Sequence, residues 1–250
     1  MSETLRPEAL DALAEVGNIG AGTAATALSQ MTGARIDLGV PRVSLVPVED
    51  VPARVGGDDT TVVAVLLEVT GDAPGRVVIM IPVSAAHALV ATLMGQPPPD
   101  PDAALEADFD ELALSALQEV GNVLTSAYLG ALSSFTGLMM EPTPPAVGVD
   151  MAFALLADAV VDVAETSAQA LLIETDFADT AEPTAGALLY IPTPVALEAV
   201  LGRLGFGAGA WGASGWPGPR WAPPPPRPPS RGPAARPASA RISPLATPAP

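Results

Sequence analysis

The feature that most constrains this chain is an internal repeat. A shift of 104 residues lays the segment 12–18, Ala-Leu-Ala-Glu-Val-Gly-Asn, over the segment 116–122, Ala-Leu-Gln-Glu-Val-Gly-Asn. The correspondence continues downstream at Thr32 and Thr136, at Pro41 and Pro145, and, with an offset of 110, at Ile81 and Ile191. The repeat predicts two homologous halves, at about 5–95 and 104–205, that share one architecture.

Each half predicts the same order of elements. The Ala- and Leu-rich stretches 7–31 and 105–135 contain few breakers other than glycine and end near a Thr-Gly pair that suits a helix C-cap. Strands are expected at 43–48, 61–69, 75–81, 147–149, 168–174 and 185–191, closing helices at 84–94 and 194–204, and one further helix at 151–163. The sequence therefore predicts an α/β fold: a pseudo-twofold, three-layer α/β/α domain in which two helix–three-strand–helix halves share one sheet.

Charge divides the chain into two parts. Residues 1–205 contain all 28 acidic residues and six of the eleven arginines, a formal charge of −22, whereas the remaining five arginines give the rest of the chain +5. An acidic body of this kind repels phosphates, so we expect no nucleic-acid partner. Residues 206–250 are rich in Pro, Gly, Ala, Arg and Ser and cannot bury enough apolar surface to fold, so we expect a disordered tail after a domain at 1–205.

Cellular location is constrained by what the sequence lacks. Without cysteine, the chain has no disulfide, thiolate nucleophile or cysteine metal site. The first residues lack the basic and apolar regions of a secretory signal. Apolar stretches such as 62–67 are strand-sized, well short of the ~20 residues of a membrane helix. We expect a cytoplasmic monomer that does not insert into membranes.

A polar stripe occurs at the same place in both halves. Asp11, Glu15 and Asn18 follow one another at i, i+4 and i+7, so at about 100° per residue they lie within roughly 60° on one helix face. Ser115, Glu119 and Asn122 repeat this stripe. Asparagine is a poor helix former, and a glycine beside it, Gly17 or Gly121, costs about 1 kcal/mol relative to alanine in a helix interior. We expect that another backbone or a partner approaches the helix closely there.

The full pattern is Asp or Ser, three residues, Glu, two residues, Asn, twenty-two residues, Pro. It occurs twice, as Asp11, Glu15, Asn18 and Pro41 and as Ser115, Glu119, Asn122 and Pro145. This pattern resembles the signature of the CheC, CheX and FliY phosphatases, which dephosphorylate the chemotaxis response regulator CheY, and two intact copies without a motor domain resemble CheC most. The resemblance covers about residues 5–205.

The resemblance implies an enzyme, a protein aspartyl-phosphate phosphatase. Asn18 and Asn122 would each position the attacking water, and Glu15 and Glu119 would pair with the partner's active-site lysine. Asp11 and Ser115 are assigned no chemical role. The implied partner is a phosphorylated CheY-type response regulator, which supplies its own Mg²⁺, so the resemblance implies no cofactor bound by this chain.

Other interpretations remain open. The run from Gly17 to Gly22 looks like a phosphate loop, but it lacks the preceding strand of a nucleotide fold. The single histidine, His87, lies in an apolar helix and is more typical of packing than of metal binding. A metal centre made of carboxylates alone stays open, although the acidic residues outside the stripes show no ligand spacing. The alternative function is a non-catalytic adaptor that binds the response regulator or a CheD-type receptor deamidase; an adaptor would act only stoichiometrically.

Overall fold

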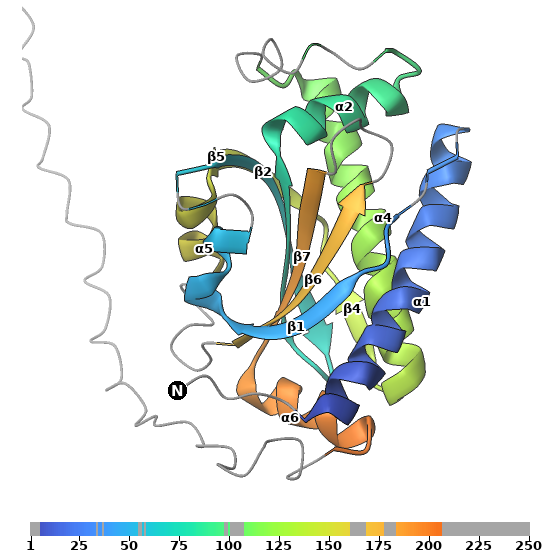
Figure 1. Cartoon of the computed structure of the whole chain (residues 1–250), viewed down its shortest axis with the longest axis vertical. Coiled ribbons are helices and arrows are strands. Elements are labelled where there is room, and N and C mark those ends of the chain that lie inside the picture. The colour runs from blue at the N-terminus through green and yellow to red at the C-terminus, as the bar shows by residue number, and fades with distance from the viewer. Residues whose placement is uncertain are drawn as a thin grey trace, which may run out of the picture. The chain divides into compact units, whose positions relative to one another are not determined.

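Two long antiparallel helices lie on the same face of the sheet (Figure 1). The computed structural model describes residues 6–33, 35–36, 38–54, 57, 59–97, 100, 108–160, 169–177 and 184–206. Helix α1 spans Pro7–Thr32 and helix α4 spans Glu111–Thr136, 26 residues each. Both end at a left-handed glycine, Gly33 or Gly137 (φ 68° in each), whose N–H donates to the carbonyl four residues earlier. The expected Thr-Gly C-caps are therefore present in both halves.

The start of α4 differs from the expected boundary near residue 105. Residues 108–110 are not helical, and 105–107 lie outside the described residues. Asp110 has extended backbone geometry (φ −73°, ψ 170°), and its Oδ1 accepts a hydrogen bond from the Ala113 N–H at 2.7 Å. This N-cap fixes the first helical residue at Glu111.

The remaining elements follow the expected order in both halves. The strands are β1 (Arg42–Pro47), β2 (Thr61–Gly71), β3 (Gly75–Pro82), β4 (Met140–Pro142), β5 (Ala146–Met151), β6 (Gln169–Phe177) and β7 (Thr184–Pro192). The shorter helices are α2 (Val83–Leu93), α5 (Ala152–Val160) and α6 (Pro194–Arg203), with 3-10 turns η1 (Val48–Asp50) and η2 (Pro52–Arg54). Strand β4 and the two 3-10 turns are the elements of these that the sequence did not predict. The end of the helix expected at 151–163 and the expected tail, apart from Phe206, lie outside the described residues.

The two halves are interlocked in one antiparallel sheet. The strand order is β1-β6-β7-β3-β2-β4, and β5 also pairs with β2. At the centre, β3 pairs with its own repeat, β7, from Gly75 opposite Pro192 to Met80 opposite Ala187. At the two sides, the first strand of each half pairs with the second strand of the other half, β1 with β6 and β5 with β2. One sheet is therefore built from both repeats.

The sheet has a buried core on each face, which gives three layers (Figure 1). Side chains that alternate along β2 show this: Val63 and Val65 pack toward the long helices, whereas Val62 and Ala64 pack toward the opposite face. On that opposite face α5 contributes Ala152 and Leu156 to the second core. The expected α/β/α architecture with two repeated halves is confirmed.

Candidate functional site

The four residues predicted to be catalytic lie on the outer faces of the two long helices. Glu15 and Asn18 are exposed on α1. On α4, Glu119 is exposed and Asn122 is half-buried. Within each helix the glutamate and the asparagine are three residues apart, so their side chains are neighbours on the surface. One pair lies on α1 and the other on α4, so the structure presents two separate candidate sites.

The Glu–Asn pairs have no partner within the described part of the chain. None of the four side chains makes a hydrogen bond or an ion pair with another described residue. Asp11 and Ser115, which begin the two stripes, are exposed as well. These polar groups therefore face outward, where a second molecule can reach them.

The glycine before each asparagine is explained by the chain's own sheet. A Cβ on Gly17 would lie 2.7 Å from Val43 Cγ2 and 3.5 Å from Pro41 Cγ, at the start of β1. A Cβ on Gly121 would lie 2.5 Å from Val65 Cγ1 on β2. The expected close approach therefore occurs on the inner side of each helix, and it holds the helix against a strand directly beside the asparagine.

Beside its polar stripe, the second half makes one hydrogen bond that the first half lacks. Gln118 Nε2 donates to the Pro145 carbonyl at 3.5 Å, which ties the segment before β5 to α4. The repeat places Ala14 at the equivalent position in α1. Sequence reasoning missed this residue, although the Gln-for-Ala difference inside an otherwise matching segment is a visible signal.

The rival constellations do not form sites among the described residues. Gly17, Gly20 and Gly22 all lie inside α1, so they do not form a phosphate loop. The His87 ring stacks on the Phe109 ring, with centroids 3.9 Å apart and 10° between the planes. In the described ranges no three His, Asp or Glu side chains come together in a way that could hold a metal ion.

The faces around the Glu–Asn pairs are open surface. A cavity of about 20 Å³ lies beneath α1 and α4 and is lined by Thr125, Tyr128, Tyr190 and apolar neighbours. None of the four candidate residues lines it.

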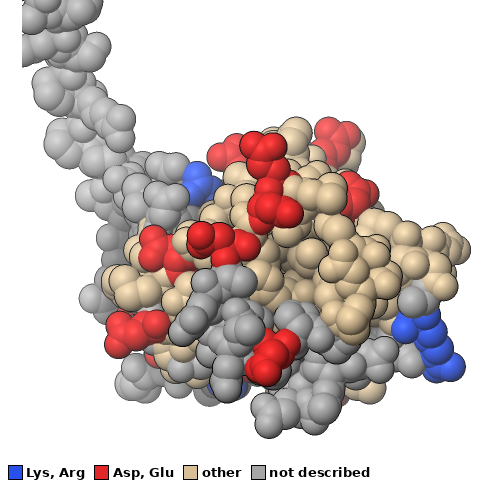
Figure 2. All heavy atoms as spheres, turned by 90° about the horizontal axis from the view of Figure 1, so that it is seen from above, with Lys and Arg blue, Asp and Glu red and all other residues tan. Residues whose placement is uncertain are grey.

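Acidic side chains gather over part of the face shown in Figure 2, with few basic ones among them. No described helix is long and apolar enough to cross a membrane.

Comparison with known proteins agrees with this arrangement. The CheC-like family matches residues 8–45 and 112–149, two segments separated by the same 104 residues as the repeat. The CheY-P phosphatase CheC of Bacillus subtilis (strain 168) is 33% identical over 175 residues, which cover 70% of this chain and 82% of that protein. The putative CheY-P phosphatase CheC1 of Halobacterium salinarum is 26% identical over 149 residues, 58% of this chain and 71% of that protein.

Solved structures share the fold. FliY of Thermotoga maritima superposes with a TM-score of 0.62 at 23% identity, covering 80% of this chain and 98% of that chain. A chain of the FliM-SpeE complex from H. pylori gives a TM-score of 0.60 at 13% identity, covering 80% and 96%. At these identities the likeness concerns the arrangement of helices and strands alone.

Fold and site together define a class of protein: a two-repeat α/β domain that presents the same outward Glu–Asn pair on each of two antiparallel helices. The extent and identity of the match to the Bacillus subtilis protein then make the assignment. This chain belongs to the CheC family.

Proposed function

We propose that this protein hydrolyses the aspartyl phosphate of a phosphorylated CheY-type response regulator. The observation that carries the proposal is the outward Glu–Asn pair on each long helix, without a partner among the described residues. The names of the two relatives, one a CheY-P phosphatase and the other a putative CheY-P phosphatase, support the choice of substrate.

The proposed reaction needs a positioned water more than it needs a reactive side chain. The water oxygen forms a bond to phosphorus while the bond from phosphorus to the partner's aspartate oxygen breaks, which releases phosphate and a free carboxylate. Most catalysis of phosphoryl transfer comes from positioning and electrostatic stabilisation. A carboxamide suits the task because its oxygen accepts a hydrogen bond from the water. Asn18 and Asn122 take this role in the proposal.

Glu15 and Glu119 are assigned to docking. Each lies one helical turn before its asparagine, where a carboxylate can form a charge-assisted hydrogen bond with a lysine of the response regulator. The Mg²⁺ that neutralises the phosphate belongs to the response regulator in this scheme, so this chain contributes no metal ligand. The open surface around both pairs suits a protein substrate, because a small molecule is usually enclosed in a pocket.

The decisive test is hydrolysis of purified, phosphorylated response regulator with Mg²⁺ present. Asn18→Ala and Asn122→Ala should each leave residual activity, because each removes one of two sites, and the double variant should lose nearly all of it. Turnover should fall with little change in binding, since the water is held most strongly in the transition state. If the double variant works as fast as the parent, the catalytic assignment is wrong.

The glutamates should behave differently from the asparagines. Glu15→Ala and Glu119→Ala should weaken docking as well as turnover, because each removes a charge pair to the partner. The adaptor alternative predicts another outcome: the response regulator's phosphate lifetime would change only when this protein is present in stoichiometric amounts. A CheD-type deamidase as a second partner remains a prediction from the family resemblance.

A further inference from the structure

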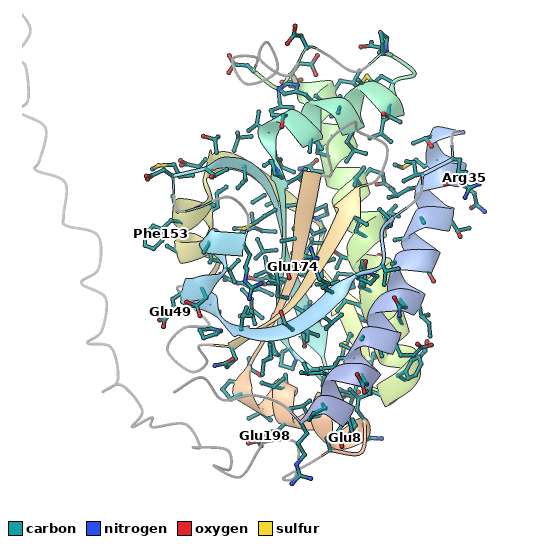
Figure 3. The ribbon with its side chains drawn as sticks, in the orientation of Figure 1. Glu8, Arg35, Glu49, Phe153, Glu174 and Glu198 are labelled. Carbon is teal, nitrogen blue, oxygen red and sulfur yellow. The ribbon has the colours of Figure 1, made fainter. Side chains whose placement is uncertain are left out.

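Asn18 lies on the side of α1 that points away from α4. A Cβ on Gly20 would collide with the Tyr128 ring, so Gly20 marks the line where the two long helices touch. At about 100° per residue, Asn18 lies roughly 200° from Gly20, on the other side of the helix. In Figure 3, Glu8 and Arg35 mark the two ends of α1. The neighbours of Asn18 are therefore residues of α1 itself and not residues of α4.

In α4, the asparagine has a glutamine beside it. Gln118 is four residues before Asn122, which places the two side chains about 40° apart on one side of the helix. Gln118 Nε2 donates to the carbonyl oxygen of Pro145 at 3.5 Å, so this side of α4 faces the segment that leads into β5. Asn122 is half-buried whereas Asn18 is exposed, and the repeat places Ala14 where α4 has Gln118. The two sites therefore share the Glu–Asn pair but differ beside the asparagine.

The contact with Pro145 decides which end of the Gln118 amide is available. A carbonyl oxygen can only accept a hydrogen bond, so Gln118 directs Nε2 to Pro145 and keeps Oε1 as a free acceptor. The carboxamide of Asn122 also has two different ends. The proposed reaction uses Oδ1 of Asn122 to accept a hydrogen bond from the water, so Nδ2 needs an acceptor on another side. A glutamine four residues earlier suits that need, because Gln and Asn at i and i+4 of a helix can form a hydrogen bond.

We propose that Gln118 is a positioning residue of the α4 site: its Oε1 accepts a hydrogen bond from Asn122 Nδ2 and so directs Asn122 Oδ1 toward the attacking water. In the free protein Asn122 makes no hydrogen bond with another described residue. The bond forms when the response regulator docks, because docking expels the water that competes for both amides. The α1 site has no equivalent, since Ala14 carries no polar group, so the α4 site is the faster of the two. This proposal rests on the proposed function.

The test measures each site alone. The Asn18→Ala variant retains the α4 site, and the Asn122→Ala variant retains the α1 site. With saturating phosphorylated response regulator, the α4 site should turn over about fivefold faster, the effect of one ordinary hydrogen bond used in the transition state. In the Asn18→Ala background, Gln118→Met should remove this advantage, so that kcat falls about fivefold and KM stays nearly unchanged. Methionine keeps the length and helix propensity of glutamine but lacks the amide.

Two controls separate positioning from a general loss of structure. In the Asn122→Ala background, Gln118→Met should leave kcat unchanged, because the α1 site lies on the other helix. Gln96→Met, at an exposed glutamine after α2, should affect neither site. An unchanged kcat at the α4 site, an equal loss at both sites, or an α1 site as fast as the α4 site would each overturn the role of Gln118 while the asparagine roles stand. Full activity in the double asparagine variant would overturn both proposals.

Discussion

At the scale of single residues, the glycines of the long helices occupy three kinds of environment. Gly121 faces the whole Val65 side chain, with Cγ1, Cβ and Cγ2 between 2.5 and 3.1 Å from an added Cβ. Gly17 faces one methyl group of Val43, a half-buried residue of edge strand β1. Gly22 faces open space. The sequence predicted a close approach beside each asparagine, but it could not tell the three apart, because the neighbours come from distant strands.

These environments predict a graded response to the same substitution. Gly22→Ala should raise the free energy of unfolding by up to about 1 kcal/mol, the difference in helix propensity. Gly121→Ala should lower it by about 1–3 kcal/mol, because Val65 is fully buried and cannot move aside without strain. The change in the free energy of unfolding for Gly17→Ala should lie between these two values. Urea unfolding measures all three, and equal effects at Gly17 and Gly121 would contradict the difference between edge and inner strands.

At the scale of elements, α1 and α4 have the same length and C-cap but different beginnings. Asp110 caps α4 with its side chain, whereas Arg6, the N-cap of α1, makes no side-chain cap bond. Helix type, C-caps and most strand positions could be predicted, because periodicity and glycine act locally. The start of α4 was predicted about six residues early. The stretch before Asp110 contains alanine and acidic residues in the proportions that are typical of a helix. Strand β4 has three residues, too few to show alternation.

The cap difference gives opposite predictions for two substitutions. Asp110→Ala should lower the melting temperature through a loss of about 1 kcal/mol, because the Ala113 N–H loses its acceptor. Arg6→Asp should raise it by a similar or smaller amount, since it supplies an acceptor at extended geometry and a negative charge at the helix start. Differential scanning calorimetry compares them; a destabilised Arg6→Asp variant would show that the arginine has another role.

At the scale of the whole molecule, the exchange of first strands makes each half depend on the other. Strand β1 pairs with β6 of the second half, and β5 pairs with β2 of the first. The repeat predicted one shared sheet, and that is confirmed. The strand order could not be predicted, because every strand of a repeat has two chemically similar candidates for a partner. The candidate residues could be placed on the outer helix faces, but the alignment of α1 with α4 depends on the Gly20–Tyr128 contact, which no local pattern reveals.

The exchange predicts the behaviour of an isolated half. A chain of residues 1–97 should form a dimer, because β3 normally pairs with its own repeat and β1 needs a second strand from another half. Two copies supply both, whereas one copy leaves strand edges unpaired, which favours association. Size-exclusion chromatography with light scattering gives the mass. A folded, monomeric half would contradict the dependence described here.

The β3–β7 pairing at the centre of the sheet also has an evolutionary consequence. If one half needs a second copy, a single-repeat ancestor would have worked as a homodimer in which both helices carried identical sequences. Duplication and fusion of such a gene would join the two copies and remove the requirement for identity. Each helix could then change its sequence independently. In this chain Ala14 and Gln118 occupy equivalent positions of the repeat, as do Asp11 and Ser115. Fusion thus allowed one symmetric surface to become two surfaces that can be tuned separately.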